Sequence, residues 1–275
     1  MKPANFDYAR CERVESALDL LAEHGDDARI IAGGQSLMAM LNMRLVRPSI
    51  VVDIASLDEL AYVKEAAGYV EFGATVTQAA AEAWPALRKR VPLVAAALPH
   101  IGHFQTRNRG TICGSLCHAD PSSELPLCLA TLGGDVVLRS RRKKRVVGAL
   151  DFQIGLLSTA KQPDEMMVAA RYPAARSGWG YAFREISRRH GDFAIVALAA
   201  VVGDGKIRLG VGGVDDKPAV HEWDDMDDDS LADALNDFAW DLGGGDDIHA
   251  TARYRREMVR RLGKKVIGEA RQCRS

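Results

Sequence analysis

The order of hydrophobic and polar positions predicts alternating strands and helices in the first third of the chain. Residues 15–24 carry leucines and alanines at helical spacing, and Gly25 follows where that helix is expected to end. The other helices are expected at 36–45, 75–83 and 85–98, and the strands at 29–32, at 50–54 and in a hairpin over 62–73 that turns near Gly68. This β-α-β alternation is typical of an α/β fold.

The pattern changes from Asp135 onward, where strands predominate. The strands are expected at 136–139, 146–148, 165–172, 181–186, 195–202 and 207–214, with helices at 231–242 and 252–270. The small, Gly-rich segment 174–180 is the expected domain boundary. We interpret the basic run 141–145 as a solvated hairpin tip, with a docking site for an acidic partner as the alternative. The acidic run 224–229 is interpreted as a solvated loop.

Composition and charge argue against several classes of protein. The chain has 275 residues, is 47% hydrophobic and 27% charged, and has a net charge of -1, which argues against a dedicated nucleic-acid binder. No apolar run approaches the roughly 18 residues that span a membrane, and residues 1–7 show no secretory signal. Five cysteines without framework spacing favour reduced thiols in the cytoplasm.

The first candidate site is the segment Ile30-Ile31-Ala32-Gly33-Gly34-Gln35-Ser36-Leu37, where a predicted strand meets a predicted helix. Paired glycines let backbone approach a ligand closely, and Ser36 can cap the helix, whose free N–H groups favour an anion. These features suit a phosphate or pyrophosphate. The spacing matches neither GxGxxG nor the Walker pattern, and a tight turn without a ligand is the alternative.

The second candidate site is the segment 107–126, which is rich in small and hydroxylated residues and includes Asp120 and Glu124. We interpret it as a long ordered loop, a feature that is usually functional inside a compact domain. Its donors and hydroxyls could bind a polar heteroaromatic ring with a ribityl or ribose chain. Cys113, Cys117 and His118 allow a metal site as an alternative, but a fourth ligand is not evident nearby. We therefore assign neither a metal site nor a catalytic nucleophile.

The third candidate site is the segment 180–195, interpreted as strand, polar turn and strand with outward charges. Its arginines Arg184, Arg188 and Arg189 could instead reach a phosphate or a flavin carbonyl, since guanidinium suits planar recognition. His190 is expected to be a turn residue.

These segments, in this order, resemble the FAD-binding medium subunit of the molybdenum hydroxylases, the carbon monoxide dehydrogenase/xanthine dehydrogenase family. The resemblance covers essentially the whole chain, and it rests on Phe6-Asp7-Tyr8, AGGQS at 32–36, RNRGTICGS ending at Ser115, HADPSSELP ending at Pro126 and FREISRRHGDFA ending at Ala194. It implies an α+β fold similar to the vanillyl-alcohol oxidase class. Residues 1–175 would be the FAD-binding domain, with subdomains 1–55 and 56–175, and 176–275 a C-terminal α+β domain.

The resemblance also implies which residues contact FAD. Residues 30–37 match the pyrophosphate loop, and Asp120 and Glu124 match acidic positions that contact the cofactor. The segment Gly110, Thr111, Ile112, Cys113, Gly114 and Ser115 contains the counterpart of the T-I-G-G-N loop near the flavin and ribityl chain. The positions implied near the ring are Ile101 and Met167, which pack on it, Arg184, near its pyrimidine side, and Phe193, which can shield one face.

The chain departs from that motif at two positions, Cys113 for Gly and Ser115 for Asn. A side chain at Cys113 must avoid positive φ or point away from the cofactor.

By this resemblance, the chain is expected to be an electron-transfer subunit that binds FAD and carries no catalytic residue. Its expected partners are a small iron–sulfur subunit and a large molybdopterin subunit, as a dimer of heterotrimers. Electrons would pass from iron–sulfur clusters through FAD to an external acceptor, while substrate reacts on another polypeptide. The alternatives are a stand-alone FAD-dependent oxidase of this fold class and a non-catalytic assembly subunit.

Overall fold

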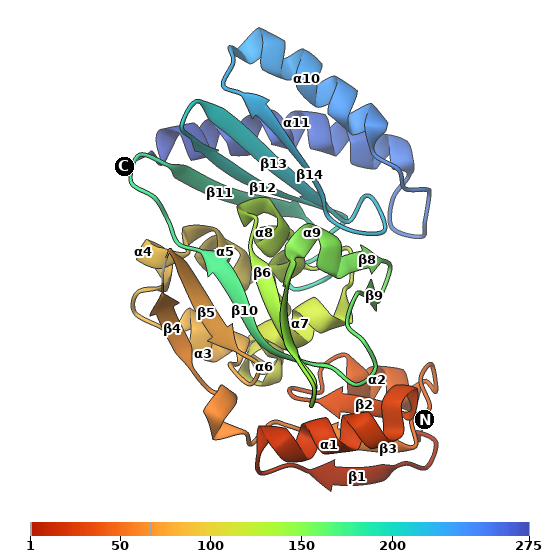
Figure 1. Ribbon diagram of the computed structural model, residues 1–275. Helices are drawn as coiled ribbons and strands as arrows, with labels where there is room; N and C mark the ends of the chain where they lie inside the picture. Colours follow the sequence, from red (N-terminus) through yellow and green to blue (C-terminus); the bar gives the residue numbers. More distant parts are fainter. Residues whose placement is uncertain (1, 67, 275) are drawn as a thin grey trace.

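The fold, taken from a computed structural model that describes residues 2–66 and 68–274, stacks three sheets along the molecule (Figure 1). The first is a parallel three-stranded sheet of order β1-β3-β2. Its elements are β1 (Asp7–Arg10), α1 (Val14–His24), η1 (Gly25–Asp27), β2 (Ala28–Ile31), α2 (Leu37–Asn42) and β3 (Ile50–Asp53). Helix α1 buries Val14, Ala17, Leu18 and Leu21 on one face, the spacing that predicted it.

The second sheet is antiparallel, with strand order β4-β5-β10-β6-β7. Its strands are β4 (Val63–Ala66), β5 (Tyr69–Gly73), β6 (Asp135–Arg139), β7 (Lys144–Gly148) and β10 (Met166–Pro173). The helices of this part are η2 (Asp58–Leu60), α3 (Gln78–Glu82), α4 (Leu87–Arg90), α5 (Pro92–Ala97), η3 (Leu98–His100), α6 (Phe104–Arg109), α7 (Ile112–His118), α8 (Glu124–Leu132) and α9 (Ala149–Phe152). A small hairpin joins β8 (Gln153–Gly155) to β9 (Ser158–Thr159).

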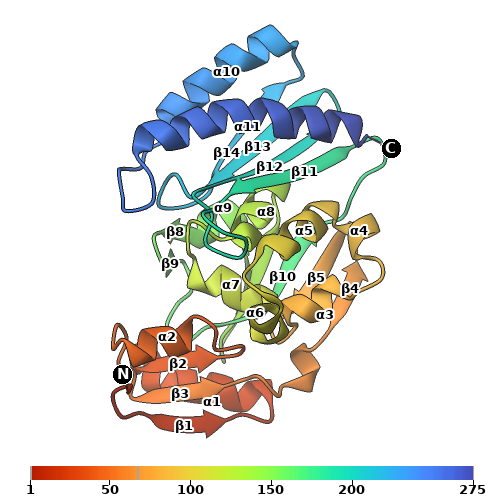
Figure 2. The same cartoon turned by 180° about the vertical axis from the view of Figure 1, so that it is seen from behind.

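The third sheet is an antiparallel meander, β11-β12-β13-β14, with two long helices on one face (Figure 1). Its elements are β11 (Gly180–Ile186), β12 (Val196–Gly203), β13 (Lys206–Gly212), β14 (Ala219–Asp224), α10 (Asp228–Asp241) and α11 (Ala252–Gln272). Helices α5 and α8 contact the same sheet from the other side, as both views show (Figures 1 and 2).

Strand β12 explains the longest apolar run of the sequence. All eight of its residues are buried, because the sheet is covered on both faces. Alternate residues of β12 pack into two different hydrophobic clusters. The cluster shared with the second sheet contains Ala197, Ala199 and Val201. The cluster under α10 and α11 contains Leu198 and Ala200. Side chains of a strand alternate between its faces, so one strand joins the two cores.

The expectation of a long loop at 107–126 is wrong, because the structure forms α6, α7 and the start of α8 there. Thr111 caps α7, its Oγ1 accepting from the N–H of Gly114 at 2.9 Å. Ile112, Cys113 and Leu116 form the buried face of the helix. An i, i+1, i+4 apolar pattern is present, but cysteine supplies one of its three positions, and this hid the period.

The helix expected over 85–98 is two helices, α4 and α5. Pro92 begins α5 and Val91, with φ -139° and ψ 66°, leaves the helical region, since proline restricts the residue that precedes it. The helix expected over 75–83 is shorter, because Thr77 is the N-cap of α3. Strand β14 was not expected.

Both charge runs are solvated, as expected: residues 141–144 at the tip of the β6–β7 hairpin and the aspartates of 224–229 are exposed, and some of their side chains also form ion pairs within the chain. In the acidic run, Asp225 pairs with Arg271 and Arg274 of the C-terminal segment at 2.8 and 2.9 Å, and Asp227 caps α10. In the basic run, Arg145 pairs with Glu165 at 2.7 Å. Intramolecular pairing therefore accounts for parts of both runs.

Gly268→Ala is expected to stabilise the protein. Gly268 lies inside α11, and among the described residues no heavy atom lies within 4 Å of a Cβ built there. Alanine in a helix interior is favoured over glycine by about 0.5–1 kcal/mol, so thermal melting should shift upward by about 1–4 °C. The matched variant is Gly263→Ala, whose Cβ would lie 2.8 Å from Leu235 Cδ2 and should lower the midpoint. A lower midpoint for Gly268→Ala would contradict the packing described.

Across residues 2–66 and 68–274, no helix combines the length and apolar character needed to cross a membrane.

Candidate functional site

The loop after β2 and the α6–α7 turn, which the sequence analysis treated as two separate candidate sites, are in contact in the structure. A Cβ built on Gly33, which follows β2, would lie 2.0 Å from the carbonyl oxygen of Arg109 and 2.8 Å from the Cα of Gly110. Only glycine permits so close an approach of two backbones. The loop after β2 and the α6–α7 turn therefore form one continuous surface.

The loop from Gly33 to Leu37 presents a row of free backbone donors. Gly34 has a φ of 71°, and the first helical hydrogen bond runs from Met38 N–H to Gly34 oxygen at 3.1 Å. Within the described ranges, the five N–H groups of residues 33–37 donate to no protein acceptor. Successive free N–H groups in a turn favour an anion, so the loop fits the pyrophosphate of a dinucleotide. The expected cap by Ser36 is wrong, since its side chain makes no capping bond.

The α6–α7 turn is fixed against α3. Gln78 N–H donates to Gly110 oxygen at 2.8 Å, and Ile112 N–H donates to Val76 oxygen at 3.1 Å. Gly114 is exposed and Ser115 is half-buried, whereas Ile112 and Cys113 are buried. In this segment, Gly114 and Ser115 are the positions that a ligand at the surface can reach.

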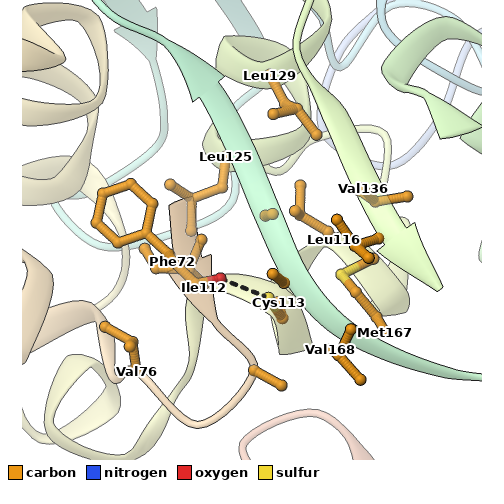
Figure 3. Packing of buried hydrophobic residues seen from close by; sticks show 14 of the residues in the cluster. Phe72, Val76, Ile112, Cys113, Leu116, Leu125, Leu129, Val136, Met167 and Val168 are labelled. Atoms are coloured by element: carbon orange, nitrogen blue, oxygen red, sulfur yellow. Dashed lines mark hydrogen bonds between the residues drawn. The ribbon is translucent and has the colours of Figure 1, made fainter. Parts of the chain in front are cut away.

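Cys113 points away from that surface into the core (Figure 3). Its thiol is 2% exposed, its Sγ lies 3.6 Å from the carbonyl oxygen of Phe72, and its φ is not positive. Burial raises the pKa of this thiol well above its usual value. The extra side chain at this motif position therefore meets the requirement stated from the sequence.

Cys113→Ala is expected to lower the free energy of unfolding by about 1 kcal/mol, because it removes a buried group and leaves a small cavity. FAD affinity should stay at the wild-type value, since the side chain faces β5 and not the surface. Thermal melting and a flavin titration measure the two effects. A large loss of FAD affinity at unchanged stability would show that Cys113 reaches the ligand.

Cys117 and Met167 lie together behind α7. Their sulfur atoms are 4.0 Å apart, and Met167 is 3% exposed. Burial raises the pKa of Cys117 to about 11, which keeps it a thiol rather than the thiolate that binds metals. Burial lowers the pKa of His118, opposed by Asp120. In the part of the chain that the structure describes, no three His, Cys, Asp or Glu side chains gather as a possible metal site.

A second group of the predicted residues surrounds η3. Arg107 Nη1 donates to the carbonyl oxygen of Ile101 at 3.1 Å and holds this segment to α6. A Cβ on Gly191 would lie 2.8 Å from Gly102 oxygen, so the β11–β12 loop packs beside Ile101. Phe193 on that loop is 67% exposed, and is available to cover a ligand.

Arg184 and Glu124 differ in how far each is already paired. Arg184 donates three hydrogen bonds of 2.6–2.9 Å to Glu269 of α11, so its guanidinium is largely engaged. Glu124 is buried at the start of α8, and burial, with smaller contributions from Glu185 and Asp120, raises its pKa to about 8.

The sequence analysis did not identify three polar residues of these two groups: Gln78, His100 and Glu185. Gln78 is 4% exposed, and its Oε1 has no partner among the described residues. Glu185 lies 3.3 Å from His100 Nδ1. For Gln78, a polar amide among alanines was a weak signal of a special role. His100 and Glu185 lie far apart in the chain, so no local sequence pattern indicates that they pair.

Comparisons with known proteins agree with this geometry. Residues 4–175 match the family model described as the FAD binding domain in molybdopterin dehydrogenase. The nicotine 6-hydroxylase medium subunit of Paenarthrobacter nicotinovorans is 38% identical over 98% of this chain and 99% of that protein.

Solved structures give the same result over the whole chain. Quinoline 2-oxidoreductase from Pseudomonas putida 86 superposes with a TM-score of 0.91 at 34% identity, covering 99% of each chain. Carbon monoxide dehydrogenase from Hydrogenophaga pseudoflava superposes with a TM-score of 0.94 at 28% identity, covering 100% of each. The chain belongs to the family of FAD-binding domains of the molybdopterin dehydrogenases.

Proposed function

We propose that this chain is the FAD-binding electron-transfer subunit of a heteromeric molybdenum hydroxylase. The observation that carries the proposal is the row of five N–H groups at 33–37 that have no acceptor among the described residues, set directly against Arg109 and Gly110. A flavin dinucleotide needs such a donor row for its pyrophosphate and a second surface for its ring. The relatives named medium subunits support the same role.

In this proposal, three groups of residues hold FAD. Residues 30–37 bind the pyrophosphate. In the segment 110–115, Gly114 and Ser115 face the flavin and ribityl chain, while the buried residues, Cys113 among them, support the turn from the core side. The third group, at the ring, comprises Ile101, Asp120, Glu124, Met167, Arg184 and Phe193, of which Met167 packs from the core side. FAD held by these residues would supply one- and two-electron redox chemistry. The chain's own residues bind the cofactor, orient it and set its electrostatic surroundings.

We propose the division into an FAD-binding domain at 1–175, with subdomains 1–55 and 56–175, and a C-terminal domain at 176–275. Separate sheets support this division, as does the separate hydrophobic cluster under α10 and α11. Limited proteolysis should cut first in the Ala174–Gly180 linker. A first cut inside the second sheet would contradict this boundary.

The proposed partners are a small iron–sulfur subunit and a large molybdopterin subunit, assembled as a dimer of heterotrimers in the cytoplasm. Electrons would enter from the partner's clusters and leave to an external acceptor. Substrate chemistry would take place on the large subunit, so this chain needs no acid–base pair of its own.

The test is a visible spectrum of the chain titrated with FAD. Saturable binding with a protein-bound flavin band supports the proposal, and no binding at any FAD concentration contradicts it and favours an assembly subunit. Substrate alone should not bleach the flavin of the isolated chain, because the reacting site lies on the partner. Bleaching would identify a stand-alone oxidase. Co-purification of iron and molybdenum with a tagged chain tests the partners.

A further inference from the structure

Two exposed leucines form the tip of the β8–β9 hairpin. The strand pairing leaves Leu156 and Leu157 as its two-residue turn, and they are 60% and 47% exposed. Turns of this length favour glycine, asparagine and aspartate, whereas Leu157 has a φ of 51°, which disfavours a large side chain. Ile154 of β8 is exposed beside them. Leucine at an exposed tip adds nothing to the core of this chain, so these side chains suit contact with another molecule.

The hairpin is fixed to the end of α7. Leu157 N–H donates to the carbonyl oxygen of Ala119 at 3.1 Å, and Gln153 Nε2 donates to the same oxygen at 2.8 Å. Ala119 and Gln153 are both buried. Two hydrogen bonds to one buried carbonyl group hold the tip in place before a partner binds. A preorganised tip loses less conformational entropy on binding than a mobile loop does.

A second exposed apolar group follows α2. The helix ends in a Schellman motif, in which Arg44 has a φ of 58° and Leu45 N–H donates to Met40 oxygen at 2.9 Å. The residue at the position of Leu45 frequently packs back onto the helix in this motif. Here Leu45 is 67% exposed, and Met43 is 51% exposed. The motif therefore fixes a leucine that faces water.

The hairpin and α2 lie side by side at one edge of the molecule, as both views show (Figures 1 and 2). Burial lowers the pKa of Lys161, two residues after β9, and the nearby charge of Arg29 on β2 lowers it further, so the chain after the hairpin is close to the first sheet. A Cβ built on Gly34 would lie 3.4 Å from Met38 Cγ, so α2 borders the loop 33–37. We call the exposed apolar residues of both groups the edge surface; they are Met43, Leu45, Ile154, Leu156 and Leu157.

The charges around the edge surface are positive. Residues 28–52 and 152–163 contain no Asp or Glu. Arg44 and Arg47 are exposed, and across residues 2–66 and 68–274 neither guanidinium has a carboxylate within ion-pair distance. Methionine and arginine are enriched in protein–protein interfaces. An apolar centre with unpaired arginines at its edge complements a protein face of apolar side chains edged by carboxylates.

We propose that the edge surface docks the iron–sulfur subunit, through a face of that subunit with an apolar centre and a rim of carboxylates. The proposal rests on the proposed function, in which that subunit delivers electrons to FAD on this chain. An electron donor must lie near the cofactor, and α2 borders the loop that would hold the pyrophosphate. A rigid tip suits a partner of fixed shape, which favours a protein over a lipid surface.

The experiment purifies the tagged chain from cells that make the whole complex, and measures iron, molybdenum and flavin per chain. Leu45→Glu and Leu156→Glu each place a carboxylate in the apolar centre, so each should lower the iron per chain by about tenfold or more. The melting temperature and the FAD affinity of each isolated variant should stay at the wild-type values. The matched control is Ile248→Glu, which changes a side chain 91% exposed between α10 and α11 and should leave the iron unchanged.

Arg47→Glu tests the charge complementarity. It should lower the iron per chain severalfold at low salt, because a carboxylate at this place would face the carboxylate rim of the partner. The wild-type complex should itself lose iron as the salt concentration rises, since exposed charges are screened. Lys265→Glu reverses an exposed charge on α11 and is the control, which should keep its iron.

The outcomes separate this inference from the proposed function. Loss of iron in both leucine variants, with FAD affinity and folding unchanged, supports the inference. Full iron in these variants would overturn it and leave the proposed function intact. Loss of molybdenum with iron retained would assign the edge surface to the large subunit, which also overturns it.

Two other occupants are tested with the isolated chain. Dimerisation that Leu156→Glu abolishes would assign the edge surface to a second copy, and binding to anionic lipid vesicles that Leu156→Glu abolishes would assign it to a membrane. Either result would contradict docking of the iron–sulfur subunit. A wild-type chain that carries flavin and no iron would overturn the inference together with the proposed partners, whereas a wild type that binds no FAD would overturn the proposed function.

Discussion

Gly33→Ala is expected to weaken FAD binding by about tenfold to a hundredfold while most of the fold persists. The added Cβ would lie 2.0 Å from the carbonyl oxygen of Arg109, a distance that no rotation of a side chain can relieve. The loop after β2 and the α6–α7 turn must therefore separate. FAD would bind across both segments, so binding must bring them back together against an overpacking cost of about 1–3 kcal/mol, and each 1.4 kcal/mol is about tenfold in affinity. A fluorescence titration with FAD measures the loss.

Gly155→Ala is the matched control. No heavy atom among the described residues lies within 4 Å of a Cβ built on Gly155, and its φ is not positive. This variant should bind FAD with wild-type affinity. Equal FAD affinity for Gly33→Ala and wild type would contradict the assignment of the loop after β2 to the cofactor, since the separated loop would then have no role in binding.

Elements with one clear periodicity were predictable from the sequence. Helix α1 and strand β12 followed from apolar spacing, because burial on one face or on both leaves a regular pattern. Helices α7 and α8 were missed for opposite reasons. The buried face of α7 includes a cysteine, and α8 is buried on almost all sides, so neither shows the alternation with charged residues that marks a surface helix.

The candidate site was predictable only as separate segments. Local motifs indicated 33–37 and 110–115, because glycines and small polar residues mark close backbone approach. The contact between Gly33 and Arg109 depends on how two sheets are placed. The same holds for Glu185 beside His100. Sequence patterns report on neighbours along one element, whereas these contacts join residues that are far apart in the chain.

Arg145→Met is expected to lower the free energy of unfolding by about 1.5–3 kcal/mol, because it removes charge-assisted hydrogen bonds from a buried carboxylate; the Arg145 side chain is itself 30% exposed, and Gln162 N–H still donates to Glu165 at 2.8 Å. Arg145 Nε and Nη2 donate to the two oxygens of Glu165 at 2.7 and 2.8 Å, and Glu165 has a side chain that is 0% exposed. Thermal melting should shift down by about 5–10 °C. Arg141→Met, which breaks an exposed pair with Asp19, is the control and should cost less than about 1 kcal/mol.

The pH dependence of the Arg145→Met effect identifies its cause. The hydrogen bond from Arg145 holds the pKa of Glu165 below its usual value. The pair therefore contributes its stability above the ordinary carboxyl pKa of about 4.3 and loses it as pH falls through the lowered value. In Arg145→Met the buried carboxylate lacks its main partner, so it protonates more readily. The gap in melting temperature between variant and wild type should be widest at pH 7 and narrow toward pH 4.

The double variant Arg145→Met/Glu165→Gln, which carries no buried charge, should recover part of the loss at pH 7. A gap that is the same at both pH values, with no recovery in the double variant, would show that lost packing of the Arg145 stem, and not the stranded charge of Glu165, causes the destabilisation.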